Sequence, residues 1–167
     1  MREGIIMDVN KSHSEQEIID VYERNVDMVY RICFSYMKNI VDSEDAVSQT
    51  FIKYLNYHKP FLSLEHEKAW FIVTAKNTCK DMLKQWWYKK RIDKEIILTT
   101  DPFDKDKTRE AVLELPNRYK MVTYLYYYEG YNNQEIAHIL KIPSSTVRNR
   151  LARSRKILKR KLGENMI

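Results

Sequence analysis

Residues 132–155 have the sequence NNQEIAHILKIPSSTVRNRLARSR, and this stretch decides the fold. Asn132, with Glu135 three residues later, has the pattern of a capping box, which predicts the start of a helix. Apolar residues follow at helical spacing until a proline interrupts the pattern, and Ser144 or Ser145 then opens a second helix. Two short helices joined by a tight turn predict a helix-turn-helix.

The second helix of this motif combines an apolar stripe with a polar and basic surface. Val147 and Leu151 return to the small core of the motif, while no Asp or Glu stands between Lys141 and Lys161. Such a helix fits the major groove of duplex DNA, where Arg and small polar side chains contact base edges and phosphates. An amphipathic hairpin with a basic exterior is the alternative. The candidate duplex-binding residues are Ser144, Ser145, Thr146, Arg148, Asn149, Arg150, Arg153 and Arg155.

Three longer helical patterns precede the motif. Apolar residues recur at helical spacing from Ile18 to Met37, and the acidic run from Asp42 to Asp45 is typical of a helix start. A long helix is expected from Leu64 to Arg91, with a core stripe that includes Cys79. Its other stripe is polar and basic, because steps of four residues keep side chains on one side of a helix. That stripe consists of Lys76, Asn77, Lys80 and Lys84.

The charge of the chain is unevenly distributed. The whole chain of 167 residues carries a net charge of +6, whereas residues 1–67 alone hold 7 Lys/Arg against 12 Asp/Glu. Residues 68–91 and 109–167 are the basic zones, and two such zones suggest two separate contacts with a polyanion. Between them, residues 92–108 lose helical periodicity, which predicts a linker. If fully extended, such a linker reaches about 56 Å. The sequence therefore predicts an all-α protein of two small helical domains, 1–91 and 109–167, joined by the linker 92–108.

Both halves carry motifs of a known family. The helix-turn-helix, together with the run from Asp42 to Phe51 and the run from Trp70 to Asn77, resembles the extracytoplasmic-function (ECF) type of bacterial RNA polymerase sigma factors. The resemblance covers roughly residues 18–162. Members of the family often have Gly where Lys141 stands, so a non-glycine residue must be tolerated in this turn.

The resemblance implies a division of labour between the domains. The N-terminal domain would bind core RNA polymerase through Asp42, Glu44, Asp45, Gln49 and Phe51. It would also capture the unwound −10 strand of the promoter, and the residues expected there are Phe61, Lys76, Asn77, Lys80, Lys84, Trp87, Lys89, Lys90 and Arg91. The C-terminal helix-turn-helix would recognise the −35 element as duplex DNA. Members of the family commonly have an anti-sigma partner, although no residue here identifies one.

Two other classes of protein fit the sequence less well. A one-component transcriptional regulator would need a ligand-binding or dimerisation domain, and the N-terminal half instead holds a second basic helix. An enzyme such as a nuclease is opposed by the lack of a Gly-rich phosphate loop and of metal-ligand spacing among the four histidines. We therefore expect no catalytic residue, metal or cofactor. No signal peptide or membrane span is evident, which predicts a cytoplasmic protein without membrane insertion.

Overall fold

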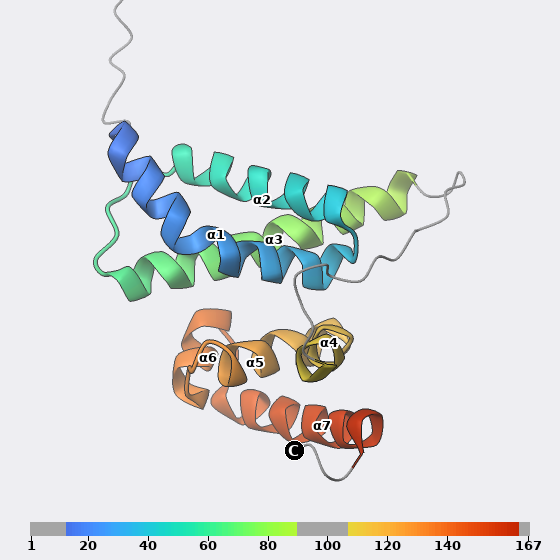
Figure 1. Cartoon of the computed structure of the whole chain (residues 1–167). Helices are drawn as coiled ribbons and strands as arrows, with labels where there is room; N and C mark the ends of the chain where they lie inside the picture. Colours follow the sequence, from blue (N-terminus) through green and yellow to red (C-terminus); the bar gives the residue numbers. More distant parts are fainter. Residues whose placement is uncertain (1–12, 90–106, 164–167) are drawn as a thin grey trace, which may run out of the picture.

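The computed structural model describes residues 13–89 and 107–163, which form seven helices in two groups (Figure 1). The N-terminal group contains α1 (Glu15–Met37), α2 (Ile40–Leu55) and α3 (Leu64–Lys89). The C-terminal group contains α4 (Lys107–Leu113), α5 (Asn117–Tyr127), α6 (Asn133–Leu140) and α7 (Ser144–Leu162). The predicted all-α architecture of two helical domains is confirmed. Among these described helices, none combines the length and apolarity that crossing a bilayer requires.

Local capping signals determine where the first two helices begin and end. Ser14 accepts a hydrogen bond from the backbone N–H of Glu17 and caps α1, which ends at Lys38 in the left-handed conformation with φ 62°. The next residue, Asn39, accepts from the backbone N–H of Asp42 at 2.9 Å and caps α2. An Asn at this position satisfies a backbone donor that the helix leaves unpaired. Helix α2 therefore begins before the acidic run that predicted its start.

The N-terminal core lies where α1, α2 and α3 meet. Both cysteines are buried and free there, as the apolar stripes predicted. The periodicity also assigned two residues to the core that are substantially exposed, Tyr22 at 47% and Leu55 at 44%. Helical spacing places a residue on a stripe, but the edges of a stripe meet solvent wherever the neighbouring helix ends or diverges.

The helix-turn-helix is built from the residues that predicted it. The capping box is complete, because Asn132 accepts from the backbone N–H of Glu135 while the Glu135 carboxylate accepts from the backbone N–H of Asn132. Lys141 then ends α6 with a φ of 52°, in the left-handed conformation that glycine adopts most easily. Pro143 precedes α7, and Val147 and Leu151 are buried against the rest of the domain.

Each domain donates a hydrogen bond to the other through one lysine side chain. Lys38, just after α1, donates from its ammonium to the carbonyl oxygen of Leu113, the last residue of α4. Lys120 of α5 donates in return to the carbonyl oxygen of Ser35, near the end of α1. Each lysine thus binds an unpaired carbonyl at the C-terminal end of a helix in the other domain, where the helix dipole favours a positive charge.

The burial of Lys120 predicts a stability that depends on pH. The residue is 3% exposed, and burial, followed by the charge of Lys38, lowers the pKa of its ammonium from 10.5 to about 7. Between these two values the unfolded chain binds the additional proton, so the free energy of unfolding rises with pH. We expect Lys120→Met to remove a contribution of up to about 1.4 kcal/mol per pH unit from that slope.

This slope is measured by denaturant unfolding of the wild type and of Lys120→Met at several values between pH 7 and about 9. Comparison of the two proteins cancels the contributions of titrating groups that do not interact with Lys120, whereas Lys38 does interact with it. Equal slopes would contradict the assignment of the low pKa to Lys120.

Candidate nucleic-acid interface

Helix α7 presents the C-terminal candidate surface. Its apolar stripe fixes the orientation of the helix, so the polar residues between the stripe positions face outward. Most of the predicted duplex-binding side chains are exposed, namely Ser145, Arg148, Asn149, Arg153 and Arg155. The remaining ones, Ser144, Thr146 and Arg150, are half-buried.

A tyrosine of α5 holds one of these arginines. The Arg155 Nε donates to the hydroxyl of Tyr127 at 2.9 Å. This hydrogen bond raises the pKa of Arg155 and leaves its two terminal nitrogens for another acceptor. Tyr127 could not be predicted from the sequence, because 28 residues separate it from Arg155 and no local spacing links them.

Helix α3 carries the N-terminal candidate surface. Lys76 is half-buried, whereas Asn77, Lys80 and Lys84 are exposed, and Trp87 is 78% exposed. Steps of three and four residues place them within one side of the helix. This side therefore offers ammonium groups, one amide and one exposed indole, a combination that suits single-stranded nucleic acid. Of the other residues predicted here, Lys89 ends the described part of α3, and Lys90 and Arg91 lie outside the described residues.

The segment between α2 and α3 holds Phe61 in an aromatic cluster. Its ring stacks on that of Tyr57 with centroids 5.2 Å apart and meets the ring of Trp70 edge-on at 5.8 Å. Phe61 is half-buried by these contacts. It therefore forms part of a fixed aromatic wall rather than a freely projecting side chain.

The acidic residues of α2 divide into two stripes. Asp42, Asp45 and Gln49 follow one another at helical spacing, and the Gln49 amide donates to the Asp45 carboxylate at 3.1 Å. Glu44 lies on the other stripe with Phe51, whose half-buried ring contacts the rings of Tyr22 and Phe71. Glu44 and Asp45 are both exposed. The same outer surface includes three apolar residues that the sequence analysis did not assign to an interface, Val41, Ile52 and Leu55.

The two basic surfaces approach each other where the domains meet. Lys76 of α3 has its pKa lowered, first by burial and then by the charges of Lys80 and of Arg150 on α7. Nearby, Lys68 of α3 forms an ion pair with Glu129 at 2.7 Å. The Lys68 ammonium also lies over the ring of Tyr131, 5.5 Å from its centroid. In this arrangement, Lys76 and Arg150, which were predicted to bind two different promoter elements, are close enough to interact electrostatically.

Comparisons with known proteins follow the same division into two parts. The model for Sigma-70 region 2 matches residues 21–88, and the model for Sigma-70, region 4 matches residues 105–158. RNA polymerase sigma factor SigV of Bacillus subtilis (strain 168) is 32% identical over 135 residues, which are 78% of this chain and 81% of that protein. The chain belongs to the sigma-70 family of RNA polymerase sigma factors.

The similarity also identifies the type of sigma factor. ECF RNA polymerase sigma factor SigW of the same bacterium is 25% identical over 167 residues, covering 87% of each chain. This sigma factor is therefore of the ECF type, as its motifs predicted, and it is a promoter-recognition subunit for RNA polymerase. The comparisons do not favour the alternative of a one-component regulator.

Solved structures share the fold of the sigma factor. The sigma factor RpoE in the complex with the anti-sigma factor NepR from Bartonella quintana superposes with a TM-score of 0.68 at 16% identity, covering 90% of this chain and 97% of that one. CnrH in the complex with the cytosolic domain of CnrY gives 0.62 at 17% identity, covering 92% of each chain.

Proposed function

We propose that this sigma factor uses three separate surfaces at a promoter. The exposed acidic surface of α2 binds core RNA polymerase, the basic side of α3 with the adjoining α2–α3 segment captures the unwound −10 strand, and α7 binds the −35 duplex. The observation that carries the proposal is that each domain has one basic helical surface. The acidic helix α2 would repel the phosphates of DNA, which favours a protein partner there.

The −10 assignment follows from the chemistry of α3. An exposed indole at Trp87 can stack on an unpaired base, while the lysines neutralise phosphates. Asn77 offers both a donor and an acceptor to a base edge. The aromatic wall around Phe61 would shelter a base that has left the duplex.

Promoter binding requires the two domains to separate from the arrangement in Figure 1. Lys76 and Arg150 are close enough here to interact electrostatically, whereas a spacer of about 17 base pairs at 3.4 Å each separates the two elements by about 58 Å. Most of the predicted linker, residues 92–106, lies outside the described residues. The 17 residues from 90 to 106, between α3 and α4, would reach about 56 Å if fully extended, which is comparable to this separation. We place the domain boundaries at 1–91 and 109–167 as the sequence predicted, although α4 already begins at Lys107.

The function of a sigma factor also bears on where the protein works and which regulatory protein it binds. We infer that the sigma factor works in the cytoplasm and contributes no catalytic step of its own, because the polymerase supplies the chemistry. RpoE is solved in complex with the anti-sigma factor NepR, and CnrH in complex with the cytosolic domain of CnrY. An anti-sigma factor that holds the domains of this chain together would keep both basic surfaces from a promoter.

Transcription in vitro tests the function as a whole. Purified core enzyme with this protein should produce promoter-specific transcripts from a library of genomic fragments, and core enzyme alone should not. If no fragment yields a specific transcript, the proposed sigma-factor mechanism is contradicted. Specific DNA binding by the chain without core would instead favour a one-component regulator.

A further inference from the structure

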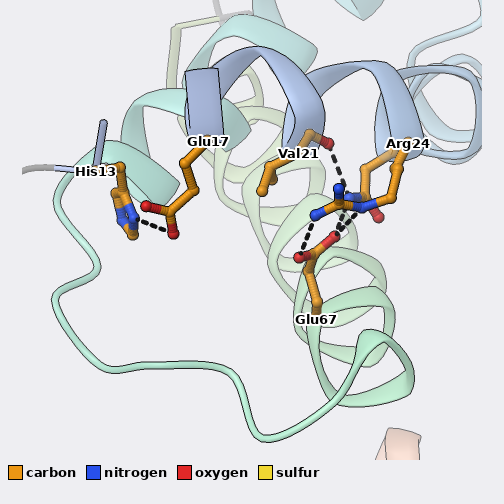
Figure 2. A network of polar contacts seen from close by, with 6 residues as sticks. His13, Glu17, Val21, Arg24 and Glu67 are labelled. Atoms are coloured by element: carbon orange, nitrogen blue, oxygen red, sulfur yellow. Dashed lines mark hydrogen bonds and ion pairs between the residues drawn. The ribbon is translucent and has the colours of Figure 1, made fainter. Parts of the chain in front are cut away.

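The segment between α2 and α3 is held at one end by His13, which lies two residues before α1 begins, and at the other end by side chains of α1. Figure 2 shows this segment running away from the helices, with two groups of polar contacts beside it. One group includes His13 and Glu17, and the other joins Arg24 to Glu67 in the first turn of α3. The segment contains Phe61 and connects to the basic side of α3, both assigned above to the −10 strand.

The first anchor is His13. Its Nε2 lies 3.0 Å from the carbonyl oxygen of Tyr57, and its Nδ1 lies 3.1 Å from the carboxylate of Glu17. Each ring nitrogen therefore lies within hydrogen-bond distance of one acceptor oxygen, one on α1 and one just after α2. The imidazole also stacks on the ring of Tyr54, with centroids 4.4 Å apart. His13 therefore fixes the point at which the chain leaves α2.

The second anchor is a buried carboxylate. Glu67 is 6% exposed, and the Arg24 guanidinium donates to it from Nη2 at 3.0 Å and from Nε at 3.3 Å. The side-chain amide of Asn25 donates at 2.7 Å to the same carboxylate and at 2.9 Å to the carbonyl oxygen of Val21. A buried carboxylate needs such donors, because an unpaired charge in this place is strongly unfavourable. This set fixes the point at which the chain enters α3.

Between the anchors, further contacts define one conformation. The ring of Phe61 is held between Tyr57 and Trp70, and the imidazole of His66 accepts from the backbone N–H of Leu62 at 3.1 Å. The Leu62 side chain at the tip remains 88% exposed. The segment is thus a preformed surface, which saves the ordering entropy that a flexible loop loses on binding.

We propose that His13 and the Arg24–Glu67 pair are positioning residues for −10 recognition. They contact no DNA themselves and act by holding the aromatic wall in the geometry that selects a base. The inference rests on the proposed function, in which this surface captures the −10 strand. Loss of an anchor should therefore broaden the choice of −10 bases while leaving the −35 preference and the binding of core enzyme unchanged.

The test compares variants of His13 that separate its two contacts. His13→Phe keeps a ring to stack on Tyr54 and removes both hydrogen bonds, whereas His13→Gln keeps an amide that can donate to the Tyr57 carbonyl. Gln16→Ala is the matched control, because its hydrogen bond to Asp20 stays within α1. Arg24→Gln weakens the second anchor independently.

The measurement is a selection from promoters with a randomised −10 element and a constant −35 element, using core enzyme and each full-length variant. We expect His13→Phe and Arg24→Gln to reduce the preference for the best base over the next by about 3- to 10-fold, because only part of the energy of the lost hydrogen bonds affects the choice of base. His13→Gln should recover most of that preference, and Gln16→Ala should equal the wild type.

Three results would contradict the proposals, and they differ in which one they contradict. If the wild type selects no −10 sequence, the proposed function itself is wrong. If the wild type selects one and His13→Phe retains its preference, only the positioning role is wrong. A lower melting temperature with equal loss at every promoter sequence would also overturn it, because a purely structural role affects all sequences alike.

Discussion

Replacing Glu44 and Asp45 together by lysine is expected to reduce the affinity for core RNA polymerase at least about 100-fold. Both carboxylates are exposed on the outer surface of α2, in the part of the chain that is acidic. Like charges placed across an interface cost several kcal/mol, and each 1.4 kcal/mol changes an equilibrium tenfold. The fold should persist, because within the described residues the hydrogen bond made by these two carboxylates is the one that Asp45 accepts from the Gln49 amide in the same helix.

The measurement is a titration of fluorescently labelled sigma factor with purified core enzyme. Glu23→Lys with Asp27→Lys is the matched control, since these exposed residues on α1 give the same change in charge. Equal loss in the two double variants would show a general effect of charge and would contradict a specific contact by α2.

Local signals explain why the helix-turn-helix could be predicted so closely. A capping box, a proline and an apolar stripe act over three to seven residues, and each is visible in the sequence without knowledge of the rest of the fold. Asn132 and Glu135 therefore form the contacts that their spacing predicted. The same holds for the polar side of α3, where spacing alone placed Lys80 and Lys84 together.

Contacts between distant residues could not be predicted in this way. His13 meets Tyr57 across 44 positions, and Lys120 meets Ser35 across 85. Nothing in the chemistry of a histidine or a lysine specifies a partner that far away, because the packing of whole helices determines which ends meet. Periodicity also fails at the edge of a stripe, as the exposure of Leu55 demonstrates.

The recognition helix should contain two kinds of arginine contact with different consequences. Arg148 and Arg155 are seven residues apart and share a side of α7, but Arg148 lies near the N-terminal end, the part that normally reaches base edges. Arg155 is held through its Nε by Tyr127 at 2.9 Å, which leaves its terminal nitrogens for a phosphate. We therefore expect Arg148→Ala to abolish the preference at one −35 position, a loss of about 1–3 kcal/mol or roughly 5- to 150-fold.

Arg155→Ala should instead weaken every promoter by a similar factor and lower the salt dependence of binding by about one unit of slope. Selection from a randomised −35 element at two salt concentrations separates the two effects, with core enzyme present throughout. Tyr127→Phe provides a matched control, because it keeps the ring and removes the acceptor of the Arg155 hydrogen bond, so it should reproduce part of the uniform loss. Unchanged base preference in Arg148→Ala, or a loss confined to one position in Arg155→Ala, would reverse the two assignments. The helix-turn-helix itself would stand in either case, because its core and caps involve neither arginine.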